Sequence, residues 1–209
     1  MPYFKCTGLA QSGGGGTDLK DLIEGTLTTI TTDATAVKKY LFYNDTVLTS
    51  FTGLSCVDIG NYSFRGCTNL QTFVCGTLTA VADQACYNMG KTGSTFDLTF
   101  NGTVGGEAFR QAKIKKALGN ITSLGSGAFR DCTTLIECHF SGASLQNLTF
   151  SGCTALADLY LTNSGGVVNI INTNALQNVP RTCKVHVPSS LLASYQSATT
   201  WQDFDLVAI

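Results

Sequence analysis

The chain has 209 residues, of which 44% are hydrophobic and only 13% are charged, and its formal net charge is −1. This length suits a single domain or one repeat array, and the near-neutral charge gives no support to nucleic-acid binding through phosphate contacts. No run of 18 apolar residues occurs, so we expect no transmembrane helix and no membrane insertion.

The N-terminal region is predicted to be a tail followed by a short cap. Residues 1–16 contain the run SGGGG, a flexible linker composition, and in a larger particle this tail would contact other subunits. A basic start followed by an apolar core is missing, so no conventional secretory signal is predicted. Thr17 or Asp18 then begins a short helix that ends at Gly25 and is expected to cap the first coil of an array.

A small residue followed by Phe, or by another apolar residue, recurs along the chain. The second members of these pairs are Phe42, Phe64, Cys86, Phe109, Phe129, Phe150 and Leu176, separated by 22, 22, 23, 20, 21 and 26 residues. Self-similarity at such a period is typical of a solenoid. We therefore predict about seven stacked coils over residues 17–187, α/β or mainly β, with short parallel strands on one face and turns or short helices on the other.

The clearest copies of the repeat also place a Cys three residues after the Phe and a Leu three residues after the Cys. These positions form the predicted core: Phe64, Cys67, Leu70, Phe109, Phe129, Cys132, Leu135, Phe150, Cys153 and Leu156. Each Phe is expected to fill the space between a strand and the turn behind it. Nine cysteines could indicate disulfides, but three of them share one repeat position, so a column of reduced interior thiols is favoured.

The array is predicted to end near residue 187. Val185 and Val187 belong to a last strand, Pro188 breaks it, and residues 188–209 form a capping helix and a tail. Trp201 and Phe204 are expected to cover the open end of the core.

The repeated pattern I-x-x-x-x-x-A-F-x-x-C-x-x-L, as in ITSLGSGAFRDCTTL, resembles the BspA-like leucine-rich repeats of bacteria over about residues 35–209. The ending V-P-x-x-L-L-x-x-Y-x-x-A-x-x-W is also similar. This resemblance implies a leucine-rich-repeat solenoid and a cell-surface or secreted protein that binds host proteins or other cells, although relatives also occur among phage and prophage proteins. Asp45, Met89 and Ala112 replace the repeat Cys, and residues 90–94 (GKTGS) are an insertion expected to bulge one loop.

Catalytic chemistry is not expected. His139 and His186 are the only histidines, and both fall at outward strand positions. Neither has the Cys or Asp company at fixed spacing that a metal site or a catalytic dyad needs. No C-x-x-C pair or H-E-x-x-H motif is present. We predict no cofactor, no metal and no enzymatic activity.

The outward side chains of stacked strands should form one continuous face, which is either a solvated surface or a binding surface. The candidate binding residues are Lys115, Lys116, Glu137, His139, Asp158, Tyr160, Lys184 and His186.

The leading hypothesis is a non-enzymatic recognition or adhesion module that binds a protein or glycan receptor on a cell surface. The missing secretion signal favours a phage virion protein of the tail or surface. A bacterial cell-surface or secreted adhesin and a purely structural subunit of an assembly remain alternatives, and the expected location is the virion or the extracellular surface.

Overall fold

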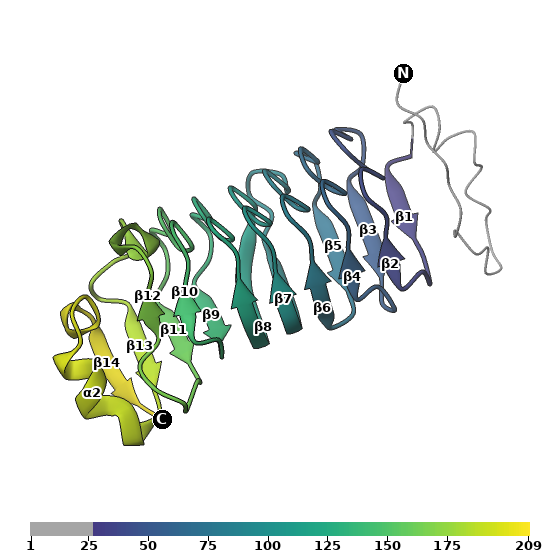
Figure 1. Cartoon of the computed structure of the whole chain (residues 1–209). Helices are drawn as coiled ribbons and strands as arrows, with labels where there is room; N and C mark the ends of the chain where they lie inside the picture. The colour runs from purple at the N-terminus through teal and green to yellow at the C-terminus, as the bar shows by residue number, and fades with distance from the viewer. Residues whose placement is uncertain (1–26) are drawn as a thin grey trace.

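The computed structural model describes residues 27–209, which form an elongated stack of coils (Figure 1). The tail predicted for residues 1–16 and the helix predicted to end at Gly25 lie outside the described residues. Every strand pair is parallel, and most strands pair with their counterpart in the next coil. This confirms the mainly β solenoid that the repeat predicts.

A row of parallel strands, here called the first strand row, begins each coil. It consists of β1 (Thr29–Thr31), β3 (Ser50–Gly53), β5 (Thr72–Cys75), the first half of β7 (Phe96–Val104), the first half of β8 (Ile114–Leu124), β9 (Glu137–Phe140), β11 (Asp158–Leu161), β13 (Lys184–Val187) and β14 (Asp205–Ala208). These strands correspond to about 9 turns. Seven turns carry the small–Phe pair of the repeat, and β13 and β14 add the remaining two.

A second strand row follows the first in the same coils. It consists of β2 (Ala36–Val37), β4 (Asp58–Ile59), β6 (Leu78–Val81), the second halves of β7 and β8, β10 (Ser144–Leu145) and β12 (Asn169–Ile170). Because β7 and β8 run through both rows, they join them into one composite sheet of nine strands, ordered β14-β13-β11-β9-β8-β7-β6-β4-β2. The repeat pattern predicts one strand per coil and misses this second row, because the second-row segments are short.

The loop after the second strand contains turns, and only the seventh coil adds a 3-10 helix, η1 (Thr173–Leu176). Left-handed backbone lies two residues before and two residues after the Phe, as at Glu107 (φ 50°) and Gln111 (φ 61°) around Phe109. The loops also bond to one another. The Phe109 N–H donates to the Ala128 carbonyl at 2.8 Å, and the Phe129 N–H donates to the Thr149 carbonyl at 2.9 Å. The small residue is needed here because its backbone lies directly against the next loop.

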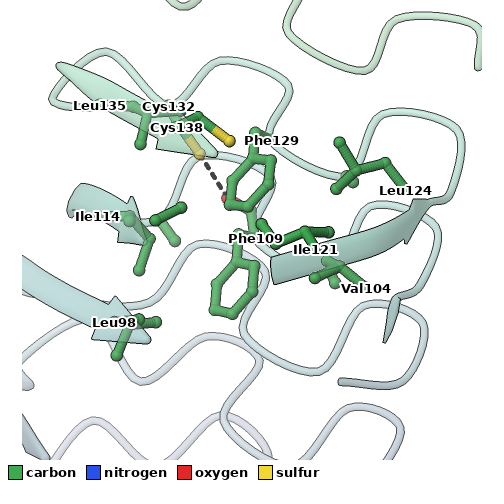
Figure 2. Packing of buried hydrophobic residues seen from close by; sticks show 14 of the residues in the cluster. Leu98, Val104, Phe109, Ile114, Ile121, Leu124, Phe129, Cys132, Leu135 and Cys138 are labelled. Atoms are coloured by element: carbon green, nitrogen blue, oxygen red, sulfur yellow. Dashed lines mark hydrogen bonds between the residues drawn. The ribbon is translucent and has the colours of Figure 1, made fainter. Parts of the chain in front are cut away.

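The Phe rings fill the space between the two strand rows. Figure 2 shows Phe109 and Phe129 with Leu98 and Ile114 of the first row on one side and Ile121 of the second row on the other. This corrects the expectation that each ring lies between a strand and a turn, because the opposite wall is a second strand. The rings stack along the solenoid axis, with centroids 5.4 Å apart for Phe109–Phe129 and 5.8 Å apart for Phe129–Phe150.

The predicted core positions are all buried. They are Phe64, Cys67, Leu70, Phe109, Phe129, Cys132, Leu135, Phe150, Cys153 and Leu156. The three repeat cysteines donate their thiols to the Phe carbonyl of the preceding coil, at 3.0 Å for Cys67, 2.8 Å for Cys132 and 3.0 Å for Cys153. The eight cysteines in residues 27–209 are all free.

The insertion at residues 90–94 interrupts the first strand row. β5 and β7 contact each other but share no ladder, whereas both neighbours of this gap, β3–β5 and β7–β8, are paired. The Lys91 N–H instead donates to the Leu70 carbonyl at 2.7 Å. The extra residues therefore widen one coil without breaking the core, which continues through Phe73 and Phe96 with centroids 5.9 Å apart.

The C-terminal cap contains η2 (Ser189–Leu191), α2 (Leu192–Ser197) and η3 (Trp201–Asp203). Tyr195 and Trp201 are buried and bind the backbone of the same residue: the Val168 N–H donates to the Tyr195 hydroxyl at 2.9 Å, and the Trp201 Nε1–H donates to the Val168 carbonyl at 2.8 Å. The last residues, expected to be a tail, form β14 and extend the sheet beyond β13.

We expect the substitution Phe129→Ala to lower the free energy of unfolding by about 3–5 kcal/mol, because it removes a fully buried ring that stacks on both neighbouring coils. Phe129→Leu, which keeps most of the volume, is the matched control and should cost clearly less. Urea denaturation followed by circular dichroism measures both, and equal losses would contradict the stacking argument.

We expect the repeat cysteines to resist thiol reagents in the folded protein. Burial raises the pKa of Cys67 to about 12 and raises the pKa of Cys132 and Cys153 as well, so little of the reactive thiolate forms near neutral pH. Iodoacetamide followed by mass spectrometry should label these three residues only after denaturation. Rapid labelling of the native protein would show that the column is open to solvent.

Candidate functional site

Two parallel rows of side chains cross the outward face of the later coils, because the first-row strands stack in register. The charged row contains Lys116, Glu137, Asp158, Lys184 and Asp205, which are successive register partners. The aromatic row lies two residues further along each strand and contains His139, Tyr160 and His186. Here both rows together are called the strand face.

The charged row contains a close ion pair. The Lys116 Nζ lies 2.6 Å from the Glu137 Oε2, and the other Glu137 oxygen lies 3.0 Å from the His139 Nε2. The hydrogen bond from Lys116, followed by that from His139, holds the pKa of Glu137 below its usual value. The same contact with Glu137 raises the pKa of Lys116. These three side chains therefore hold one another in fixed positions on the face.

The aromatic row is a stack of three rings. The ring centroids of His139 and Tyr160 are 4.4 Å apart, and those of Tyr160 and His186 are 4.0 Å apart with nearly parallel planes. The His186 Nε2 lies 2.8 Å from the Asp158 Oδ1. His186 has only 9% of its surface exposed, so the outermost groups of this row are His139 and Tyr160.

Each histidine has a carboxylate neighbour in the structure, although the sequence shows no Cys or Asp at the fixed spacing that a metal site or a catalytic dyad needs. His139 contacts Glu137 of its own strand, and His186 contacts Asp158 of the neighbouring coil. Sequence spacing does not reveal the second contact, because Asp158 and His186 are 28 residues apart. His186 is also not an exposed residue, since the Tyr160 ring covers it.

The remaining candidates, Lys115 and Lys184, are exposed. Lys184 takes its place in the charged row between Asp158 and Asp205. Lys115 does not join either row, because the register passes from Phe96–Ile114 directly to Asp97–Lys116 and leaves Lys115 as the extra residue of a β-bulge on β8. The structure thus brings seven of the eight candidates into two adjoining rows and leaves Lys115 apart.

Metal and nucleophilic catalysis each use a particular arrangement of side chains, which can be compared with this face. The described residues contain no group of three or more His, Cys, Asp or Glu side chains that could hold a metal ion. The two His–carboxylate pairs could move a proton, but no hydrogen bond within residues 27–209 joins either ring to a Ser, Thr or Cys nucleophile. Over the same residues, no helix has the length and apolar character needed to span a bilayer.

The loops of the early coils form a second exposed surface that the sequence reasoning missed. Tyr40, Tyr43, Tyr62, Arg65 and Tyr87 contact one another across three neighbouring loops and are here called the Tyr–Arg ridge. The sequence contains a signal for it. A tyrosine lies two residues before Phe42 and Phe64 (Tyr40 and Tyr62), and a tyrosine directly follows Phe42 and Cys86 (Tyr43 and Tyr87). The strand face and this ridge are built on different parts of the coil.

We expect Lys116→Met to raise the pKa of Glu137 towards its ordinary value, because the substitution removes the main group that favours the carboxylate. NMR titration of the Glu137 side-chain carboxyl measures this. A lowered pKa stabilises the fold above the unfolded-state pKa, and the contribution is lost as the pH falls through the folded-state pKa. Lys115→Met is the matched control and should leave the titration unchanged. If the pKa of Glu137 is unchanged in the Lys116→Met variant, the ion pair with Lys116 is contradicted.

Comparison with known proteins places the chain in a repeat family. The family model for the BspA type leucine rich repeat region matches six copies, over residues 24–115 and 98–199. A search of the curated proteins found no match. Among solved structures, the chain is similar to the crystal structure of a leucine rich cell surface protein from Faecalibacterium prausnitzii A2-165, with 17% identity and a TM-score of 0.40. The similarity covers 90% of this chain and 61% of that one, so the chain spans less than two thirds of its length. The matched repeats extend over most of the sequence, and the chain therefore belongs to the BspA-type leucine-rich-repeat family.

Proposed function

We propose that the chain is a non-catalytic recognition module of a bacterial cell-surface or secreted protein, and that the strand face binds a protein partner. The observation that carries this proposal is the pre-ordered arrangement of the charged and aromatic rows. Membership of the BspA-type repeat family supports it, because the resemblance to BspA-like repeats implies a cell-surface or secreted protein. Nothing in the matched repeats points specifically to a phage virion.

Pre-ordering matters because binding normally costs the freedom of each immobilised side chain. In this face, Tyr160 is already held between two rings, and Glu137 is held between Lys116 and His139. A partner that covers these groups therefore loses less conformational entropy than it would on a mobile surface. Tyr beside charged groups is also the composition that dominates binding energy at protein interfaces.

The shape of the face is suited to a broad partner. The aromatic row spans three coils and the charged row spans five first-row strands, from Lys116 on β8 to Asp205 on β14. Adjacent strands lie about 4.8 Å apart, so the charged row is about 19 Å long. This length matches one side of a protein interface of ordinary size better than it matches a small-molecule pocket.

We expect Tyr160→Ala combined with Lys116→Glu to weaken attachment of the purified chain to its target cells by at least roughly tenfold, since the change removes the central ring and reverses one charge. Flow cytometry with a fluorescent chain, on bacterial cells and on epithelial cells, measures attachment. Thr72→Ala, on an early first-row strand, is the control. Attachment that survives the double substitution would rule out the strand face as the binding surface.

The cellular location is tested separately. Labelling of intact producer cells with a membrane-impermeant amine reagent should modify this chain, since several of its lysines are exposed. Recovery of the chain in purified phage particles, with none on the surface of intact cells, would contradict the surface assignment and favour a virion protein.

A further inference from the structure

A groove of about 650 Å³ runs along the second strand row, where β2, β4, β6, β7 and β8 pass into their loops. Its polar lining includes Lys38, Lys39, Asp58, Asn61, Asp83 and Ser123. At about 4.8 Å per strand, five strands give it a length of about 19 Å. The groove belongs to the early and middle coils and contains no residue of the strand face.

The Tyr–Arg ridge borders this groove. Lys39 and Asn61 line the groove, and the next residues in the chain, Tyr40 and Tyr62, belong to the ridge. The rings of Tyr40 and Tyr62 stack with centroids 4.9 Å apart, and Tyr43 meets Tyr40 edge-on at 5.7 Å. Tyr40 and Tyr43 are 46% and 42% exposed, so aromatic carbon faces water next to the groove residues Lys39 and Asn61.

Arginine extends this aromatic surface into the next coils. The Arg65 guanidinium lies over the Tyr87 ring at 4.8 Å and over the Tyr62 ring at 5.6 Å, and it also bonds to the side-chain oxygen of Gln84. Arg110 contacts the other side of the row, 5.3 Å from the Tyr87 ring. The exposed tyrosines are therefore parts of one continuous layer and are not isolated surface residues.

The backbone conformation at Tyr40 and Tyr62 is shared with the loops of other coils. Tyr40 and Tyr62 have φ angles of 61° and 60°, a left-handed conformation that disfavours a bulky side chain by about 1 kcal/mol or more. The equivalent positions of the later coils, Gln84, Glu107, Gly127 and Leu148, adopt the same conformation, so this backbone strain belongs to the repeat. What is specific to the early coils is the aromatic side chain, which is not part of the buried core at Tyr40 or Tyr62.

The lining restricts which kind of polymer the groove could hold. Lys38 and Lys39 are balanced by Asp58 and Asp83, so the groove has no excess positive charge for a polyanion such as a nucleic acid. An extended peptide would need an unpaired strand edge, but β4, β6 and β7 each have strand partners on both sides. A peptide that used side-chain pockets is also disfavoured, because the large apolar lining residues Val37, Ile59 and Val81 are buried in the core.

The same lining suits sugar hydroxyl groups. The Asp58 Oδ1 accepts from the Thr79 hydroxyl at 2.6 Å, and the Asp83 Oδ1 accepts from the Gly106 N–H at 2.6 Å. One oxygen of each carboxylate is thereby held by a hydrogen bond, and both residues line the groove. Carboxylate, amide and ammonium groups bind hydroxyls, while the apolar faces of sugar rings pack against aromatic side chains.

We propose that this groove and the Tyr–Arg ridge bind an uncharged linear glycan, with the polysaccharide chain in the groove and one or more sugar rings packed against Tyr40 and Tyr43. This surface is separate from the strand face. The proposal therefore goes beyond the proposed function, and it stands or fails independently of a protein partner.

The test uses immobilised linear oligosaccharides as probes: neutral hexamers of β-linked glucose, N-acetylglucosamine, mannose and xylose, together with uronic-acid and sulfated oligosaccharides. The full chain should bind at least one neutral hexamer. The double variant Tyr40→Asn and Tyr43→Ser should weaken that binding by at least roughly tenfold in calorimetry. Asn suits a left-handed backbone, so the variant removes the ring while relieving strain, and the fold should be retained.

The matched control is Leu148→Asn, which changes another left-handed residue in a coil away from the groove and should leave glycan binding unchanged. Tyr160→Ala, which alters the strand face, should also leave it unchanged. Failure to bind any neutral hexamer would overturn the proposal. It would equally be overturned by binding confined to the acidic probes, or by equal affinity of the double variant and the unmodified chain at matched thermal stability.

Discussion

The fold depends on hydrogen bonds that a single coil cannot make for itself. In the loops of the first six coils the N–H of the Phe-type residue finds its acceptor in the next coil, as between Phe109 and Ala128. The same step places one ring on the next, so backbone pairing and aromatic packing reinforce each other. Since a buried peptide group without a partner is costly, a coil is stable only beside its neighbours.

This dependence on neighbours also creates the surfaces. Because the strands stack in register, residues at the same position of successive coils lie side by side in a row. Where these residues differ in type, each can contact its neighbours in the row. His139, Tyr160 and His186 illustrate this, since each ring comes from a different coil. The Tyr–Arg ridge arises in the same way from the loops. Both surfaces are products of the stacking.

Periodicity is the part of the structure that could be read directly from the residues. The small–Phe pair and the Cys three positions later predicted the solenoid, the buried column that contains Phe129 and Cys132, and the position of the strand face. The segments that escaped prediction were too short to show a period, as with the second-row strand Asp58–Ile59, or lay beyond the last repeat, as with β14.

Contacts between coils were harder to foresee than the coils themselves. The partner of His186 is Asp158, and no local pattern links two residues so far apart. Tyr40 and Tyr62 stack only because both loops take the same left-handed turn, which the residue types argue against. The register of one coil on the next, once known, makes each of these contacts simple to explain.

The parallel register has a geometric consequence, because strand stacking sets a regular spacing between equivalent side chains. Within each paired ladder, equivalent side chains recur about every 4.8 Å along the axis, so a substitution changes one position and leaves the spacing of the others intact. Duplication of a whole coil would lengthen the surface by one strand spacing without moving the side chains already present. The length of such a surface can therefore change in discrete steps while the chemistry of each position stays the same.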